Sequence, residues 1–170
     1  HFLRVTDINK RDWIQWDAVP FCEIDKADLE KYKLKKGDIV IARMADPGKV
    51  AIIDDDSESA VFASYLIRLK MKEPGTTTPY YLFYYLNSPI FQTFVSGAST
   101  GTTRKSINAT EIRSFDLLIP SPNIVSYFTE TVKQLRINIT KNVKEVRNLT
   151  KIRDLLLPRL MSGRIRLVNA

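Results

Sequence analysis

The chain has 170 residues, of which 44% are hydrophobic and 26% charged, and its formal net charge is +7. This composition is typical of a globular protein, and the length predicts one domain with or without an appendage. Its one cysteine (Cys22) and one histidine (His1) exclude disulfide frameworks, zinc sites and catalytic triads. Since no apolar stretch approaches the ~20 residues of a membrane span, we expect a cytoplasmic protein.

The positive charge is confined to the C-terminal part of the chain. Residues 1–120 contain 16 Lys and Arg against 16 Asp and Glu, whereas residues 121–170 contain 10 against 3. The motif Pro120-Ser121-Pro122 lies at this change in composition. The sequence therefore predicts two parts, 1–120 and 121–170.

Short β-branched runs bounded by turn residues dominate the first part of the chain. They predict strands at residues 2–6, 38–43 and 49–53. The apolar stretch 59–71 predicts a pair of strands or one long bent strand. We interpret the three aspartates at 54–56 as a solvated turn and Cys22 as a small core residue.

Two short helices are predicted in the middle of the chain. The runs 80–87 and 90–95 each follow a proline, which the first turn of a helix tolerates, and their aromatic residues are expected to pack on the sheet. Residues 114–119 predict a last strand. Together these elements predict the α+β class, with a strand-rich mixed domain over residues 1–120.

The loop 96–105 has the most polar composition of this domain. It contains five hydroxyl side chains, two glycines, Arg104 and Lys105. Hydroxyls, backbone N–H groups and basic side chains are the groups that contact phosphate oxygens. Composition alone leaves a plain surface loop equally open.

One long helix is predicted after Pro122. Residues 123–157 contain neither glycine nor proline, so a helix of about 50 Å is possible at roughly 1.5 Å per residue. Seven residues step alternately by four and three and form a heptad seam. This seam consists of Phe128, Val132, Leu135, Ile139, Asn142, Val146 and Leu149. We expect it to pair with a second helix, while a helix packed on its own domain is the alternative.

No catalytic or metal-binding constellation is found in the sequence. The acidic residues lack the spacing of a metal-binding loop, and the glycines of the 96–105 loop lack the Gly-Lys-Ser/Thr ending of a phosphate-binding loop. We therefore predict no catalytic residue, no metal and no cofactor.

Five segments, in order along the chain, resemble motifs of the specificity subunits of type I restriction–modification systems. The segments are residues 34–43, 63–69, 101–107, 117–122 and 155–165. The first contains Gly-Asp-Ile before an arginine, the third Gly-Thr-Thr-Arg, and the last Leu-Leu-Pro-Arg-Leu-Met-Ser-Gly. Each motif is weak alone, but five in the order of the family cover nearly the whole chain.

This resemblance implies a non-catalytic subunit that recognises double-stranded DNA and reads one half of a bipartite target. It implies methyltransferase subunits and a restriction subunit as partners. The long helix would pair as an antiparallel coiled coil, and residues 121–170 would set the spacing and dock the methyltransferases. The paired helix would come from a second recognition half or from a homodimer. Whether the chain is a C-terminal half of a longer subunit or a half-sized subunit stays open.

With this resemblance we expect DNA contacts from strand ends and from the polar loop. The candidate residues are Arg43, Lys49, Ser64, Tyr65, Ser99, Thr100, Thr102, Thr103, Arg104 and Lys105. The last four are assigned to the DNA backbone. For Arg43, a bidentate contact with guanine and a salt bridge to Asp46 are both open.

Two other functions remain as alternatives. The chain could be a helical scaffold that binds only protein. A DNA-modifying enzyme is the least favoured, because the glycine-rich cofactor loop and the Asn/Asp-Pro-Pro-aromatic motif of adenine methyltransferases are not found in the sequence.

Overall fold

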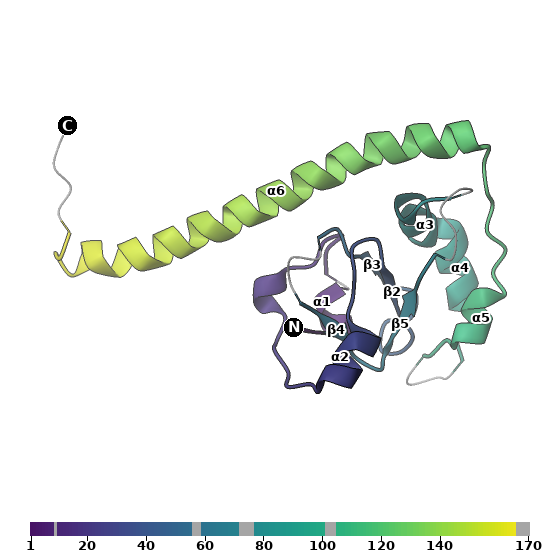
Figure 1. Ribbon diagram of the computed structural model, residues 1–170, viewed down its shortest axis with the longest axis horizontal. Coiled ribbons are helices and arrows are strands. Elements are labelled where there is room, and N and C mark those ends of the chain that lie inside the picture. The colour runs from purple at the N-terminus through teal and green to yellow at the C-terminus, as the bar shows by residue number, and fades with distance from the viewer. Residues whose placement is uncertain (9, 56–58, 72–76, 101–104, 166–170) are drawn as a thin grey trace.

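The computed structural model describes residues 1–8, 10–55, 59–71, 77–100 and 105–165. A globular unit combines two small sheets with short helices, and one long helix runs across it and extends beyond it (Figure 1). In chain order the elements are β1 (Phe2–Leu3), α1 (Val5–Ile8), the 3-10 turn η1 (Trp16–Ala18), α2 (Lys26–Tyr32), β2 (Ile39–Ala42), β3 (Val50–Ile52), β4 (Val61–Phe62), β5 (Leu66–Leu69), α3 (Pro79–Leu86), α4 (Pro89–Ala98), α5 (Ala109–Arg113) and α6 (Pro122–Met161). The predicted α+β class is confirmed.

A three-stranded antiparallel sheet in the order β3-β2-β5 lies between two apolar cores. Ile39 of β2 lies opposite Ile52 of β3 and Leu69 of β5. Because successive side chains of a strand point to opposite faces, Val40 enters one core and Ile39 the other. All residues of β2 are consequently buried, which explains its unbroken apolar sequence.

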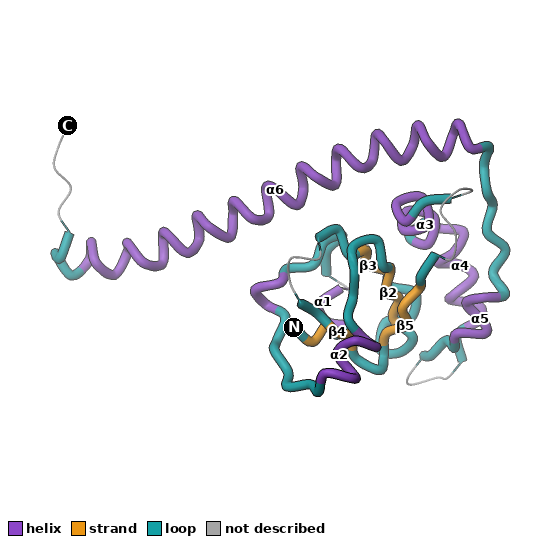
Figure 2. The backbone as a smooth tube through the Cα atoms, viewed as in Figure 1, coloured by secondary structure: helices purple, strands orange, loops and turns teal. Residues whose placement is uncertain are grey.

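Helices cover one face of this sheet and the N-terminal segments cover the other. Figure 2 shows α3, α4 and α5 on one side, with α1, α2 and β4 on the other, and β1 pairs with β4. Phe83 of α3 and Phe91 of α4 are almost completely buried against the sheet. The two predicted aromatic helices are confirmed, and each has its proline in the first turn.

Some predicted strands differ from the structure. The strand predicted at 2–6 ends at Leu3, and α1 follows it. The stretch 59–71 does form two strands, but they lie in different sheets, because β4 pairs with β1 and β5 with β2. The expectation for Cys22 is wrong, since its side chain is exposed in the segment that crosses the surface between η1 and α2.

The prediction of a strand at residues 114–119 is also wrong. These residues connect α5 to α6 without a neighbouring strand. Two tyrosine hydroxyls of α3 bind the backbone of Leu118 instead. The hydroxyl of Tyr81 donates to the carbonyl of Leu118 at 2.5 Å. The N–H of Leu118 donates to the hydroxyl of Tyr85 at 3.4 Å. Side-chain contact with α3 is made by Phe115, whose ring lies 6.0 Å from that of Tyr85, whereas the side chains of Leu118 and Ile119 are exposed.

The long helix is confirmed, and α6 has 40 residues, which corresponds to about 60 Å. It passes the expected end at Leu157 and includes Pro158. The helix ends where Gly163 adopts a φ of 68° and the N–H of Arg164 bonds to the carbonyl of Arg159 at 3.0 Å. This is a Schellman cap, so the glycine rather than the proline terminates α6. No helix among the described residues is both long and apolar enough to cross a membrane.

Candidate nucleic-acid interface and helix joint

Residues next to all three strands of the central sheet lie at the same end of the strands, which we call an edge of the sheet. Arg43 follows β2, Lys49 precedes β3 and Tyr65 precedes β5, so antiparallel pairing brings all three together. The N–H of Arg43 donates to the carbonyl of Tyr65 at 2.9 Å, and the N–H of Ala42 donates to that of Lys49 at 2.8 Å. The backbone of the sheet therefore fixes the relative positions of these three residues at one end of the strands.

The end of the polar loop joins the same edge. Ser106 forms antiparallel bridges with Met44 and Thr100, and the N–H of Ile107 donates to the carbonyl of Arg43 at 2.9 Å. This places Lys105 beside the strand ends. We call the following set the basic edge: Arg43, Lys49, Ser64, Tyr65, Ser99, Thr100 and Lys105. The other candidates, Thr102, Thr103 and Arg104, lie outside the described residues.

The side chains of the basic edge are largely open to solvent. Arg43, Lys49, Ser64, Tyr65 and Lys105 are all exposed, and a hollow of about 870 Å³ lies beside the last two. Within the part of the chain that the structure describes, Arg43 makes no ion pair. The alternative of a salt bridge to Asp46 is therefore not observed.

The turn between β2 and β3 supports this edge through two unusual backbone positions. Ala45 has a φ of 67°, and a 2.9 Å hydrogen bond joins the peptide groups on either side of it in a γ-turn. Gly48 has a φ of 89°, and a Cβ there would lie 2.9 Å from Cγ1 of Val95. Gln92 of α4 donates to the carbonyl of Gly48 at 2.9 Å and anchors the turn.

The opposite ends of the same strands carry acidic residues that face α6. Asp54 follows β3 at this end, and Arg136 of α6 binds its carboxylate through Nε at 3.2 Å and through Nη2. Nη1 of Arg136 donates to the carbonyl of Asp12 at 2.8 Å, and its guanidinium lies 5.1 Å from the ring centroid of Phe83. We call Arg136 and these three partners the joint.

The charge of Arg136 persists although its side chain is only 1% exposed. Burial lowers the pKa of Arg136, but the hydrogen bonds and the negative charge of Asp54 raise it by more, so the net pKa lies above its ordinary value. The interpretation of 54–56 as a solvated turn is wrong for Asp54, because its carboxylate is held by a buried cation. Asp56 lies outside the described residues.

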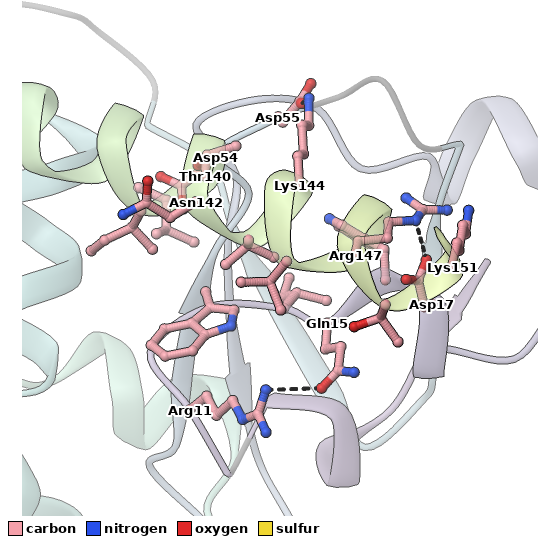
Figure 3. A pocket seen from close by; sticks show the side chains of 18 residues that line it. Arg11, Gln15, Asp17, Asp54, Asp55, Thr140, Asn142, Lys144, Arg147 and Lys151 are labelled. Atoms are coloured by element: carbon pink, nitrogen blue, oxygen red, sulfur yellow. Dashed lines mark hydrogen bonds and ion pairs between the residues drawn. The ribbon is translucent and has the colours of Figure 1, made fainter. Parts of the chain in front are cut away.

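Two further ion pairs follow along α6. Lys144 binds Asp55, and Nε of Arg147 lies 2.5 Å from Oδ1 of Asp17, as Figure 3 shows. A mostly apolar cavity of about 440 Å³ lies beside them, between α6 and the segment 11–17. Two of the basic residues of α6 are thus paired with aspartates of the globular unit.

The first turns of α6 pack on the globular unit. Val125 and Val132 are buried, and the ring of Phe128 meets those of Tyr81 and Tyr84 edge-on at centroid distances of 6.0 and 5.9 Å. The alternative of a helix packed on its own domain is thus confirmed for this stretch. Two members of the predicted seam are covered within the chain itself.

The remaining seam is more open. Ile139 is half-buried and lines the cavity with Asn142, whereas Leu135, Val146 and Leu149 are 56%, 63% and 58% exposed. The C-terminal part of α6 extends beyond the globular unit (Figure 1). Exposed apolar residues there include Ile152, Leu155, Leu156, Leu157 and Met161. Many exposed large apolar residues on one helix are typical of an interaction site.

Sequence reasoning missed the joint. Arg136 lies immediately after the seam residue Leu135, and the apolar period does not single it out. One feature of the sequence could have indicated the joint. The C-terminal helix carries an excess of basic residues, and the consecutive aspartates of residues 54–56 could form ion pairs with them. The motif Asp46-Pro47-Gly48 predicts a turn at Gly48, whereas the left-handed conformation of Ala45 had no signal in the sequence.

Comparisons with known proteins lead to the same family. The model of the type I restriction modification DNA specificity domain matches residues 22–146. The specificity subunit of the type I restriction enzyme HindI from Haemophilus influenzae is 32% identical over 115 residues, which cover 68% of this chain and 21% of that subunit. A type I restriction–modification S subunit from M. genitalium has a similar fold, with a TM-score of 0.61 and 17% identity, over 78% of this chain and 34% of that one.

The chain thus spans about a fifth of the length of the first relative and a third of the second. The matched residues 22–146 include the central sheet, the basic edge and most of the joint. Since this match covers well over half of the sequence and the fold agrees with it, the chain belongs to the type I restriction–modification DNA specificity domain family.

Proposed function

We propose that residues 1–120 read one half of a bipartite double-stranded DNA target. Membership of the specificity-domain family supports DNA recognition. The observation that carries the proposal is the basic edge, where the exposed residues Arg43, Lys49 and Lys105 lie at one end of the central sheet. Because residues 1–120 are neutral overall, this local group of cations provides the attraction to DNA.

The side chains of the basic edge divide by chemistry. Lys49 and Lys105 are suited to phosphates, because a lysine ammonium acts as a point charge with no base selectivity. Arg43 has the planar fork that binds guanine through two hydrogen bonds, and Tyr65 presents a 48% exposed ring beside it. We assign base contacts to these two residues and backbone contacts to the lysines.

The proposed role of residues 121–170 is spacing and docking. The exposed part of the seam and the apolar surface beyond it would receive an antiparallel helix, from a second recognition half or a second copy of the chain. Asn142, at the cavity, would fix the register of that pair. Methyltransferase and restriction subunits would then carry the catalytic activity, with this chain as the recognition component.

Selection from a library of random duplexes tests the DNA-reading proposal. The chain should enrich one short half-site. Arg43→Gln should then weaken binding to that half-site by about tenfold and relax the preference at one base pair, because a bidentate contact contributes roughly 1–3 kcal/mol. Lys36→Gln is the matched control, since Lys36 is exposed at the opposite end of β2.

Two outcomes would contradict the proposal. Equal loss in both variants, without any enriched sequence, would show that Arg43 contributes only charge. No binding to any duplex would favour the protein-binding scaffold, whose contacts lie on α6.

A further inference from the structure

The joint holds α6 by contacts in several directions. Asp54 accepts two hydrogen bonds from Arg136, the carbonyl of Asp12 accepts a third, and the ring of Phe83 lies against the guanidinium. These partners come from three separate segments of the globular unit: the residues after β3, the 11–17 segment and α3. Contacts from three segments restrict both translation and rotation of the helix.

The other contacts of α6 restrict it less. Val125, Phe128 and Val132 pack on the globular unit near the start of the helix, and the hydroxyls of Thr129 and Thr78 form a 2.7 Å hydrogen bond in the same stretch. The ion pairs of Lys144 and Arg147 are more open, with 56% and 34% of these side chains exposed. The pair of Lys144 is the more exposed of the two, and water and salt screen it most. Among the described residues, Arg136 therefore makes the most buried charged contact between α6 and the globular unit.

The length of α6 converts a small rotation into a large displacement. The helix continues for about 37 Å from Arg136 to Met161, at roughly 1.5 Å per residue. A rotation of about 10° moves the far end by about 6 Å. Since DNA rises roughly 3.4 Å per base pair along each strand, this displacement approaches two base pairs.

We propose that Arg136 is a positioning residue that fixes the angle between the globular unit and α6, and through this angle the spacer length of the bipartite target. The effect on the spacer rests on the proposed DNA-reading function. The effect on the angle does not, so the two are tested separately.

Distance measurement between two spin labels tests the angle. Cys22 is exposed and is the chain's single cysteine, so Arg159→Cys adds the second site on the projecting part of α6. The parent chain should give one narrow distance distribution. Arg136→Lys should broaden or shift it, because an ammonium keeps the charge but cannot contact Asp54, the Asp12 carbonyl and Phe83 at once.

Asp54→Asn gives a second variant that leaves Arg136 in place, and Lys133→Gln is the control on an exposed position of the same helix. Helix content by circular dichroism identifies the folded variants. An unchanged distribution in a folded Arg136→Lys or Asp54→Asn chain would overturn the proposal. Equal broadening in Lys133→Gln would also overturn it, because the effect would then not belong to the joint.

The spacer is tested in the assembled complex with duplexes that carry two half-sites. The parent should prefer one spacer by at least tenfold over spacers one base pair shorter or longer. Arg136→Lys should reduce this preference to threefold or less, with an unchanged affinity for a single half-site. A retained preference would overturn the role of the angle in spacing. Failure of every variant to bind DNA would instead refute the DNA-reading function, and the distance result would stand.

Discussion

The basic edge and the joint lie at opposite ends of the same short strands, and each contains an arginine in a different environment. Arg43 is exposed and has no ion pair among the described residues, whereas Arg136 is 1% exposed and bound by a carboxylate, a carbonyl and a ring. The chemical group is the same. Burial and partners therefore decide whether an arginine holds the fold together or remains available for a ligand.

Removal of each arginine should separate these roles most clearly. Arg136→Met should lower the free energy of unfolding by about 3 kcal/mol, because Asp54 then loses the partner of a largely buried pair. Arg43→Met should change it by less than about 0.5 kcal/mol, as expected for an exposed residue. Urea denaturation measures both values, and a loss below about 1 kcal/mol for Arg136→Met would show that the joint is not a structural contact.

A second prediction concerns the backbone that supports the basic edge. Gly48→Ala should lower the free energy of unfolding by about 2 kcal/mol, since the added Cβ meets Val95 and the φ of 89° is unfavourable for alanine. Gly97→Ala is the control, because a Cβ added at this helical position would have nothing within 4 Å of it. Thermal denaturation should show a lower Tm for the first variant only; equal Tm values would contradict the close packing of the turn.

The salt dependence of DNA affinity should distinguish lysines of the basic edge from lysines at the opposite ends of the strands. The double variant Lys49→Gln and Lys105→Gln should lower the slope of log K against log salt concentration by about 2 units, because two phosphate contacts are lost. Lys36→Gln with Lys70→Gln makes the same change in net charge at exposed positions away from the basic edge. Titrations of labelled duplex at several salt concentrations provide the slopes, and parallel slopes for both double variants would reject the phosphate assignment.

The smallest expected effect is at Ala45. Ala45→Gly should raise the free energy of unfolding by about 0.5 kcal/mol, because relief of the left-handed conformation slightly exceeds the entropic cost of glycine. Affinity for the selected half-site should fall about twofold, since the turn becomes less preorganised. Denaturation and titration measure the two effects. If affinity stays equal to that of the parent, the γ-turn does not contribute to binding.

Much of the architecture could be predicted because it depends on local pattern. The apolar runs of β2 and β3, the prolines before α3 and α4, and the glycine-free stretch of α6 each specify an element without reference to distant residues. The position of the basic-edge residues at strand ends and in a polar loop was also predictable from turn residues, whereas their contact with DNA stays a prediction.

The rest depends on contacts between distant residues. α2 has no buried residue, so it lacks the apolar period that would have revealed it, although Asp25 caps its N-terminus. A heptad period shows that α6 has an apolar face but not what covers it, and Phe128 contacts α3. Arg136 meets Asp54 across 82 positions of sequence, a separation that no local pattern encodes.

Exposed residues directly beside buried ones at the strand ends have a consequence for redesign of the basic edge. Arg43, Lys49 and Tyr65 are exposed, while the adjoining strand residues Ala42 and Val50 are buried. Exposed substitutions usually change stability by less than about 0.5 kcal/mol, so the side chains of this edge are free to vary while the framework beneath them stays fixed. New sequence preferences are therefore accessible by randomising a few surface positions, without compensating mutations in either core.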